Sequence, residues 1–206
     1  MRKGKLVIIS GFSGAGKGTV MKSLVSTRDN YALSVSATTR APREGEVEGV
    51  SYFFKTVEEF EQMIAEDAFL EHACYVGNYY GTPKSFVEQK RNEGKDVLLE
   101  IEIQGAMKVK ADNPDAILIF ITTKDATTLR DRLVGRGTET QEVIDKRLAR
   151  AAEEALGVED YDYIVVNDIL EDCVETVDRI VRSEHNRTSD KISIIEEIRQ
   201  DLSKES

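Results

Sequence analysis

The chain has 206 residues, of which 40% are hydrophobic and 32% are charged, a balance that fits one globular domain and excludes a disordered chain. The formal net charge of −10 argues against a general binder of nucleic acid or of membrane surfaces, because these anionic partners repel an acidic surface. Any phosphate site must therefore gather its basic residues locally.

Two cysteines and two histidines give no pattern of a metal site or a disulfide framework. Cys74 and Cys173 lie far apart in the sequence, and we expect two reduced, partly buried thiols. The apolar run that follows the basic residues 1–5 is too short for a signal peptide, and no long apolar stretch occurs elsewhere. The sequence therefore predicts a cytoplasmic protein with no membrane partner.

The first predicted strand, residues 6–9, leads into a glycine-rich turn and a helix over residues 19–28. The turn has the pattern Gly-x-x-x-x-Gly-Lys, whose glycines permit positive φ and close approach of a ligand. Its N–H groups, the positive end of the helix and Lys17 can together hold a phosphate chain. The predicted nucleotide-binding residues, called the glycine loop below, are Gly11, Phe12, Ser13, Gly14, Ala15, Gly16, Lys17, Gly18 and Thr19.

Gly18 occupies the position at which this motif usually has a hydroxyl residue that ligates Mg²⁺. The hydroxyl arrives one residue later, as Thr19. We therefore expect Mg²⁺ to be held mainly by phosphates and water, with Thr19 on a phosphate oxygen, and we assign no protein residue as a metal ligand. The alternative is a flexible turn with a solvated lysine, which the strand-turn-helix context disfavours.

Residues 37–90 interrupt the main pattern with short extended segments and many aromatic side chains. The elements expected in and beside this block are a strand over 31–39, an extended segment over 50–54, a helix capped by Thr56, a hairpin over 69–81 that turns at Gly77-Asn78, and a helix over 83–92 that begins at Pro83. The block therefore reads as a small mixed α/β insertion.

Apolar strands alternate with helices in the rest of the chain. The expected strands are 97–103, 116–121 and 163–166. One helix is expected to begin at about residue 105, and four more are expected over 125–134, 142–156, 171–186 and 190–203. This order predicts an α/β fold with a parallel sheet, helices on both faces and ligands at the carboxyl ends of the strands. Whether the isoleucines of the last helix cover the core or form a dimer contact is left open.

Charged residues on the strand and loops point to phosphate chemistry. Alternation in the strand 97–103 predicts Glu100 and Glu102 on the same side. The arginines that lie beside or within the interruptions of the core pattern are Arg40 and Arg43 in the insertion, and Arg132, Arg136, Arg147 and Arg150 around the loop 135–141. The guanidinium fork suits phosphate oxygens, so two movable arms could close over phosphates from opposite sides. The alternative for each arginine is a solvated charge paired with an acid four residues away.

The chain resembles the guanylate kinase family, the nucleoside monophosphate kinases that move the γ-phosphate of ATP to GMP, over residues 5–185. The strings that carry the resemblance are the glycine loop, Thr38-Thr39-Arg40-Ala41-Pro42-Arg43, Gly77-Asn78-Tyr79-Tyr80-Gly81 and Gly135-Arg136-Gly137-Thr138-Glu139. The second and third strings are far more specific than the glycine loop alone. The resemblance implies a P-loop kinase fold in one domain, 1–206, with a core of 1–36 and 95–206, a GMP-binding subdomain at about 37–94 and a lid at about 135–150.

The resemblance also implies roles for individual residues. Those expected at GMP are Ser36, Arg40, Arg43, Tyr52 and Tyr80 near its phosphate, Glu71, Thr82 and Glu102 near guanine, and Gly81 beside them. Those expected at ATP are the glycine loop, Arg132, Arg136 and Asn167, and the residues expected to act in catalysis are Lys17, Arg40, Arg43, Arg136 and Arg147. We expect Tyr75 and Tyr79 to be ordinary packing aromatics.

Glu71 suits guanine because N1–H and the 2-amino group are adjacent donors that one carboxylate can accept together. Adenine has an acceptor at N1, so AMP should be rejected on the order of 10⁴-fold. Glu102 stands where the family often has aspartate, and its contact with guanine, direct or through water, is left open.

The sequence thus predicts direct in-line transfer from ATP to GMP, with Mg²⁺ as cofactor and no nucleic-acid partner. The alternatives are a kinase for another monophosphate, a non-catalytic guanylate kinase-like binding module, and a P-loop NTPase switch. Glu71 favours guanine over other bases, and the intact Lys17 and Arg40 disfavour a binding module. The sequence offers no obvious residue that would position the attacking water of an NTPase. Homo-oligomerisation is left open.

Overall fold

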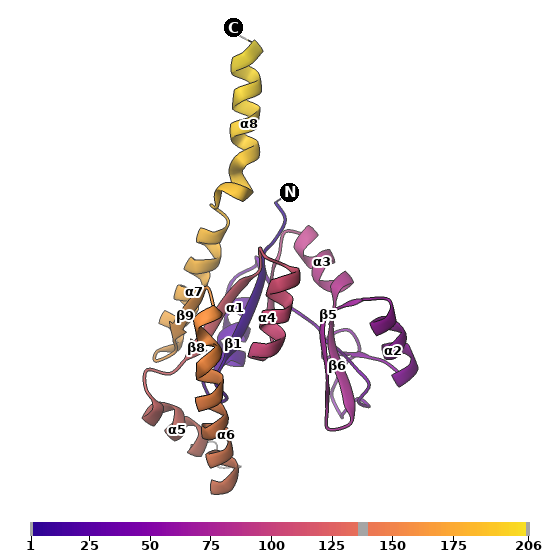
Figure 1. Ribbon diagram of the computed structural model, residues 1–206, viewed down its shortest axis with the longest axis vertical. Helices are drawn as coiled ribbons and strands as arrows, with labels where there is room; N and C mark the ends of the chain where they lie inside the picture. Colours follow the sequence, from indigo (N-terminus) through magenta and orange to yellow (C-terminus); the bar gives the residue numbers. More distant parts are fainter. Residues whose placement is uncertain (1, 136–139, 205–206) are drawn as a thin grey trace.

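The computed structural model describes residues 2–135 and 140–204, which contain a five-stranded parallel sheet with helices on both faces (Figure 1). The strands of this core sheet are β1 (Leu6–Gly11), β2 (Tyr31–Leu33), β7 (Asp96–Glu100), β8 (Ile117–Thr122) and β9 (Tyr163–Val166), in the order β2-β7-β1-β8-β9. Each neighbouring pair in it runs parallel. The predicted α/β fold is confirmed.

Alternate side chains of β1 face two different helical layers. Val7 and Ile9 pack with one layer, whereas Leu6 and Ile8 pack with the other, and all four are at most 2% exposed. The first layer contains α1 (Lys17–Thr27) and α7 (Leu170–Glu184), and the second contains α3 (Lys84–Asn92) and α4 (Ile103–Asp112). A strand covered on both faces needs a continuous apolar run, which explains the sequence of β1.

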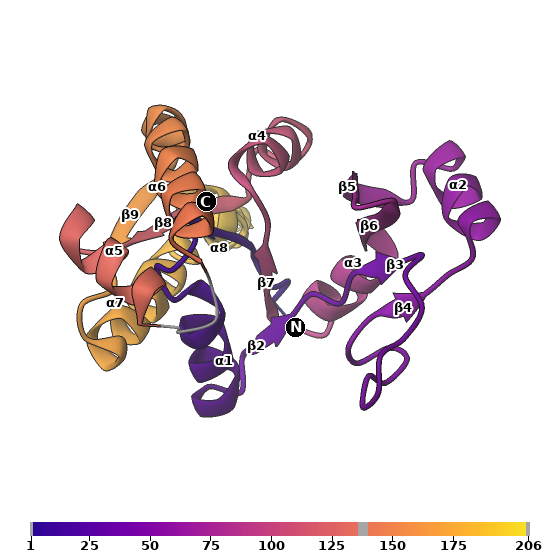
Figure 2. The same cartoon turned by 90° about the horizontal axis from the view of Figure 1, so that it is seen from below.

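A second, four-stranded sheet stands beside the core sheet, and Figure 2 shows it and α6 on either side of β7. Its strands are β4 (Phe53–Phe54), β3 (Ala37–Thr38), β6 (Asn78–Pro83) and β5 (Phe69–Tyr75), in that order, with α2 (Val57–Ala65) packed on it. Phe60 of α2 is fully buried and stacks on Phe69 and Tyr79 at centroid distances of 4.4 and 5.3 Å. The predicted packing role of Tyr79 is confirmed.

The local predictions in this sheet hold with small shifts. Thr56 caps α2 in a reciprocal capping box with Glu59. The hairpin of β5 and β6 is confirmed, but its turn lies at Val76 and Gly77, which both have positive φ, one residue earlier than expected. Pro83 ends β6 and directly precedes α3, which begins at Lys84, one residue later than expected.

The single strand predicted over 31–39 is wrong. The backbone N–H of Ser34 donates to Leu98 of the core sheet at 2.9 Å, whereas the carbonyl of Ser36 accepts from Phe53 of the small sheet at 2.9 Å. Residues 34–36 therefore carry the chain from one sheet to the other, and alternation alone does not reveal that the two ends of an extended run join different sheets.

The prediction that Glu100 and Glu102 share one side of a strand is also wrong. Strand β7 ends at Glu100, and Glu102 is the residue that precedes α4, which begins at Ile103 rather than near Gly105. The apolar residues 101 and 103 extend the apparent alternation, but the hydrogen bonds of the sheet stop at the point where the helix begins. The two carboxylates therefore lie on different elements.

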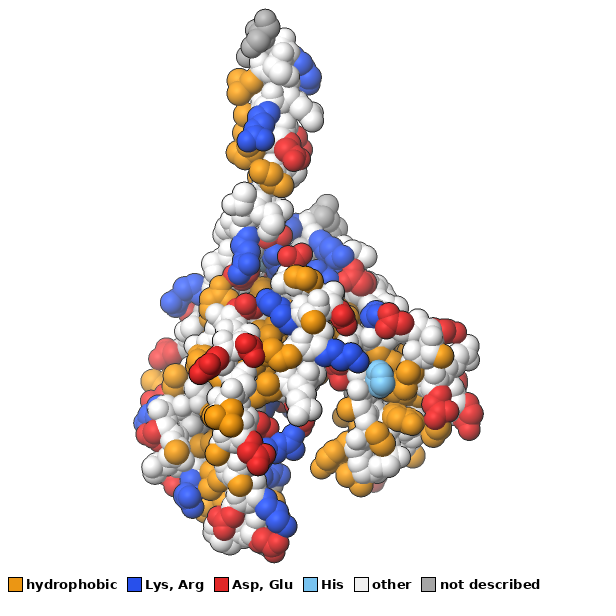
Figure 3. Space-filling view, in the orientation of Figure 1, with side chains coloured by type: hydrophobic (Ala, Val, Ile, Leu, Met, Phe, Trp, Pro, Cys, Tyr) orange, Lys and Arg blue, Asp and Glu red, His pale blue; other side chains and the backbone are white. Residues whose placement is uncertain are grey.

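Helices α5 (Ala126–Val134) and α6 (Gln141–Glu154) follow β8, and the short helix η1 (Ala155–Asp160) leads to β9. Asp125 caps α5 by accepting a hydrogen bond from the N–H of Thr128 at 2.7 Å. The expected site residue Arg136 lies outside the described residues. In Figure 3 a deep notch separates the lobe that carries α6 from the small sheet.

The last helix, α8 (Thr188–Lys204), projects away from the body of the molecule (Figure 1). Its described residues are all exposed, including Ile192, Ile194, Ile195 and Ile198, so it does not cover the core of its own chain. The Lys5 ammonium anchors its first turn through Asp190 at 2.6 Å. The alternative, a dimer contact, stays a prediction.

Two predictions about exposure need correction. Cys173 is buried, but Cys74 is exposed on β5, the edge strand of the small sheet, rather than partly buried. Tyr75, expected to be a packing residue, has 70% of its surface exposed at the tip of the hairpin. In the part of the chain that the structure describes, no helix has the length and apolar character needed to cross a membrane.

Candidate active site

The glycine loop joins β1 to α1 at the carboxyl end of the core sheet. Gly11 passes so close to β8 that a Cβ there would lie 2.0 Å from the carbonyl oxygen of Ile121. Gly16, which precedes α1, has a φ of +90°, and a Cβ on it would lie 2.5 Å from Nδ2 of Asn167. Only glycine meets both conditions, so these glycines set the path of the loop and turn its N–H groups toward the start of the helix.

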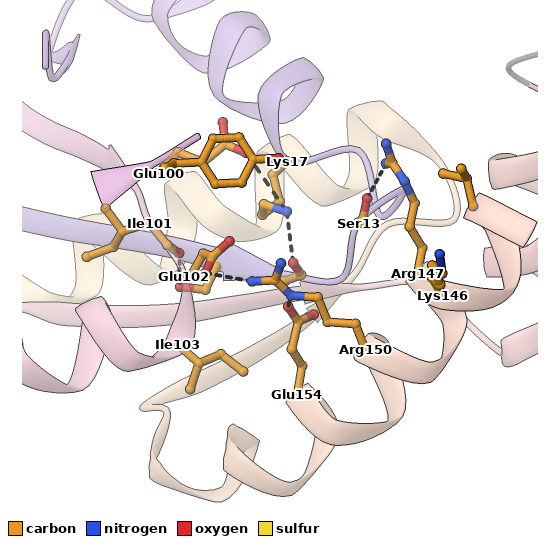
Figure 4. Close-up of a pocket in the computed structure, with 14 residues that line it drawn as sticks. Ser13, Lys17, Glu100, Ile101, Glu102, Ile103, Lys146, Arg147, Arg150 and Glu154 are labelled. Atoms are coloured by element: carbon orange, nitrogen blue, oxygen red, sulfur yellow. Dashed lines mark hydrogen bonds and ion pairs between the residues drawn. The ribbon is translucent and has the colours of Figure 1, made fainter. Parts of the chain in front are cut away.

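Lys17 lies over the glycine loop (Figure 4). Its Nζ donates hydrogen bonds to the carbonyl oxygens of Gly11 at 2.8 Å and Phe12 at 3.3 Å, and it lies 3.9 Å from Oε1 of Glu100. The ammonium thus sits between the ends of β1 and β7. A phosphate on the loop N–H groups would lie within reach of this charge.

Two polar side chains, the buried Asn167 and the partly buried Arg132, support the loop from beneath. The side-chain amide of Asn167 donates to the carbonyl of Ala15 at 2.8 Å, and Arg132 donates to the same carbonyl at 3.3 Å and to that of Asn167 at 2.7 Å. Asn167 is only 5% exposed. Both residues therefore hold the shape of the glycine loop, a role that sequence reasoning missed, and their contact with ATP stays a prediction.

Helix α6 presents two arginines, three residues apart, to the other side of the loop. Arg147 donates to the hydroxyl of Ser13 at 2.7 Å, and Arg150 pairs with Oε2 of Glu102 at 2.6 Å (Figure 4). Arg150 was named among the candidate phosphate arginines, but it was not assigned to ATP, to GMP or to catalysis. Its spacing of three from Arg147 was the signal in the sequence that could have found it.

A cleft of about 700 Å³ joins these elements. Its lining includes Lys17, Glu100, Glu102, Arg147, Arg150 and the hairpin residue Tyr75. The cleft therefore connects the glycine loop with the first turn of α4, and α6 forms one wall. Tyr75 is a second residue that sequence reasoning did not place here.

The small sheet carries an arginine cluster of its own. Both carboxylate oxygens of Glu46 accept hydrogen bonds from Nη2 of Arg40, at 2.7 and 3.0 Å, and the guanidinium lies 5.4 Å from the ring centroid of Tyr52. The hydrogen bond that Arg40 donates to Glu46 raises the pKa of Arg40 above its usual range, and Tyr80 adds a smaller effect. The ring of Tyr80 lies 6.1 Å from that of Tyr52, so three of the expected phosphate residues converge.

The two remaining expected residues of this cluster contribute backbone contacts. The N–H of Arg43 donates to Glu46 at 2.7 Å, which fixes the loop between the two arginines. Ser36 lies at the junction of the two sheets, where its carbonyl accepts from Phe53. Glu46, which accepts from both arginines, was not among the residues assigned to the site from the sequence.

Glu71 and Thr82 face each other across β5 and β6. The Thr82 hydroxyl, fully buried, donates to Oε1 of Glu71 at 2.8 Å. Burial raises the pKa of Glu71, and the hydrogen bond from Thr82 offsets this only in part. Gly81 between them lets the strands pack closely, because a Cβ there would lie 3.0 Å from side-chain carbons of His72 and Phe69.

The first turn of α4 brings Glu102 into the same region as Glu71. A Cβ on Gly105 would lie 4.0 Å from Oε2 of Glu71, and Glu102 directly precedes this turn. Glu102 lines the cleft together with the glycine loop, whereas Glu71, paired with Thr82, lies beside the first turn of α4 and does not line the cleft.

Comparison with known proteins agrees with this geometry. A sequence model of the family described as Guanylate kinase matches residues 3–184. The chain belongs to the guanylate kinase family. Family membership confirms the expected enzyme class, a nucleotide kinase, and α8 lies beyond the matched residues.

Individual relatives support the same assignment. A protein named guanylate kinase from Lactococcus lactis is 51% identical over 185 residues, 90% of each chain. One from Streptococcus pyogenes is 52% identical over 186 residues, 90% of this chain and 88% of the relative. The crystal structure of guanylate kinase from Anaplasma phagocytophilum matches with a TM-score of 0.69 and 32% identity, and the match covers 91% of this chain and 89% of that one.

Proposed function

We propose that this member of the guanylate kinase family transfers the γ-phosphate of MgATP to GMP, giving ADP and GDP. The observation that carries the proposal is the single cleft that is lined by Lys17 and Ser13 of the glycine loop and by Glu102 at the start of α4. Two phosphate chains can meet end to end there, between a phosphate loop and a purine site. A GMP phosphate oxygen would then attack the γ-phosphorus in line, without a covalent enzyme intermediate.

The ATP phosphates would lie on the glycine loop, with Lys17 and Arg147 as the cations on either side. Thr19 and Glu100 line the hollow beside the loop. One hydroxyl and one carboxylate fit a Mg²⁺ ion that keeps phosphate and water ligands, which is how this ion is usually bound. The bound ion would neutralise charge on the phosphate oxygens.

GMP would bind between the small sheet and α4. Its phosphate would meet Arg40, Arg43, Tyr52, Tyr80 and Ser36, and the Arg40–Glu46 pair supports this by holding the guanidinium in place before the ligand arrives. Its guanine would meet the Glu71–Thr82 pair and Glu102. The partly buried Glu71 carboxylate can accept from N1–H and the 2-amino group, which adenine does not offer together.

Catalysis in this scheme is mainly positioning, because a phosphate dianion needs little activation by a base. The arginines and Lys17 would hold two anions that repel each other and stabilise charge on the transferring group. We further propose that residues at about 37–94 and 135–150 close as a GMP-binding subdomain and a lid, which would exclude water and suppress ATP hydrolysis. The part of Arg136, outside the described residues, stays a prediction, as do a cytoplasmic location and self-association.

A coupled assay of ADP formation tests the proposal, with GMP, AMP, CMP and UMP offered separately beside MgATP. We expect rapid ADP formation with GMP and on the order of 10⁴-fold lower kcat/KM with AMP. Comparable rates with another monophosphate would show a different acceptor. Binding of GMP without ADP formation would favour the non-catalytic binding module instead.

The partly buried carboxyl of Glu71 should make GMP binding depend on pH. Burial raises its pKa above the ordinary value of 4.5, and only the ionised form accepts both guanine donors. As the pH falls through the raised pKa, GMP affinity should therefore fall, and this loss should begin above pH 4.5.

The measurement is the GMP dissociation constant between about pH 8 and about pH 4.5 for wild type and Glu71→Gln. The variant reports the titration of the GMP phosphate alone, so the difference between the two profiles isolates Glu71. Parallel profiles would contradict the assignment.

A further inference from the structure

Arg150 of α6 contacts Glu102, at the end of the cleft where we place the purine base. Its Nη2 lies 2.6 Å from Oε2 of Glu102, and its Nε donates to Oε1 of Glu154 at 3.1 Å (Figure 4). Glu102 stands at the N-cap position of α4, where a carboxylate could cap its own helix, yet its side chain makes no capping hydrogen bond. The carboxylate is turned toward α6 instead.

This pair is too exposed to be explained by stability. The side chains of Arg150 and Glu102 are 54% and 74% exposed, and ion pairs of this kind contribute about 0 to 1 kcal/mol. The negative charge of Glu102 is nevertheless the main cause that raises the pKa of Arg150, with a smaller effect from Glu154. The effect of the pair is therefore local: Arg150 offsets the charge of Glu102 and fixes the direction of its carboxylate.

One rigid helix reaches both ends of the cleft. Arg147 contacts Ser13 of the glycine loop, and Arg150, three residues later on the same face, contacts Glu102. Arg150 occupies Oε2 of Glu102, which leaves Oε1 to accept a hydrogen bond from a purine base. It also offsets a negative charge that would repel an incoming nucleotide monophosphate.

We propose that Arg150 is a positioning residue for the acceptor nucleotide: it orients Glu102 toward guanine and offsets its charge. The inference rests on the proposed function, in which Glu102 contacts the base of GMP. It predicts that Arg150 acts on GMP binding through Glu102 and has no direct part in binding ATP.

The test is a double-mutant cycle with Arg150→Ala, Glu102→Gln and the double variant, and Arg150→Lys as the conservative change. GMP dissociation constants are measured by calorimetry without ATP, and KM values for GMP and ATP by the coupled assay. We expect Arg150→Ala to weaken GMP binding about tenfold, to leave the KM for ATP within about twofold, and to add less than about twofold in the Glu102→Gln background. Arg150→Lys should restore part of the loss, because the charge returns without the fork.

Arg182→Ala is the matched control, since Arg182 is an exposed helical arginine paired with Asp178 at 3.2 Å on α7. It should leave both KM values unchanged. Effects of Arg150→Ala and Glu102→Gln that simply multiply would overturn the inference, as would an equal rise in the KM for ATP. If wild type forms no GDP, the proposed function fails; if wild type forms GDP and Arg150→Ala binds GMP normally, only this inference fails.

Discussion

Replacing Lys17 with alanine is expected to lower the kcat for GDP formation by about 10³-fold or more. The Lys17 ammonium lies at the end of β1, held by the carbonyls of Gly11 and Phe12, where the transferring phosphate would gain charge. Removal of one preorganised donor from such a site typically costs 10²- to 10³-fold, and a full positive charge contributes at least as much. The measurement is the coupled assay at saturating MgATP and GMP.

Lys90→Ala serves as the control for Lys17→Ala. Lys90 lies on α3, away from the cleft, and pairs with Glu93 at 2.8 Å. It should retain wild-type kcat, and both variants should unfold at a similar temperature because Lys17 contacts carbonyls of a solvent-facing loop and the half-exposed Glu100. A kcat for Lys17→Ala within about tenfold of wild type would refute the catalytic role of this lysine.

Glu71→Gln should lower kcat/KM for GMP by about 10²- to 10³-fold and change the value for AMP by no more than about threefold. A glutamine amide keeps the shape of the side chain but replaces one acceptor oxygen with a donor, which then faces a donor of guanine. Hydrogen bonds to a charged group contribute about 1.5 to 3 kcal/mol each, which gives this range for one to two bonds. The decisive quantity is the ratio of kcat/KM for GMP to that for AMP.

Thr82→Val is the companion to Glu71→Gln. It removes the hydroxyl that donates to Oε1 of Glu71 at 2.8 Å but leaves the carboxylate. We expect it to weaken GMP binding less than Glu71→Gln does and to preserve much of the preference over AMP. An unchanged ratio of GMP to AMP in Glu71→Gln would mean that the base is selected elsewhere, with Glu102 as the next residue to change.

The periodicity of the sequence predicted most of the core because its strands are buried on both faces. An uninterrupted apolar run such as residues 6–9 is typical of a strand that is buried on both faces. The glycine loop after it needs residues that can adopt positive φ, which glycine does in any fold. Capping residues such as Thr56 and Asp125 also act over three residues, so their helices began where the sequence indicated. Motif strings, rather than periodicity, identified the family.

The errors arose where two elements meet. Residues 31–39 alternate without a break, yet their two ends join different sheets. The strand predicted over 97–103 was too long, because Ile101 and Ile103 continue its alternation although β7 ends at Glu100 and Ile103 begins α4. Tyr75 was expected in a core because it is aromatic, but a hairpin tip that projects into the cleft exposes it. Local patterns carry no information about which distant segment covers a residue.

The sequence by itself determined the α/β fold, the phosphate loop with Lys17, and the family, because each depends on residues that are close in the chain. The tertiary structure decided that Asn167 and Arg132 support the loop from below and that Arg150 reaches Glu102 across the cleft. The Arg132–Asn167 contact joins residues 35 positions apart, the Asn167–Ala15 contact joins residues 152 apart, and the Arg150–Glu102 pair joins residues 48 apart. They exist because the chain crosses from strand to helix many times before it returns to the same edge of one sheet.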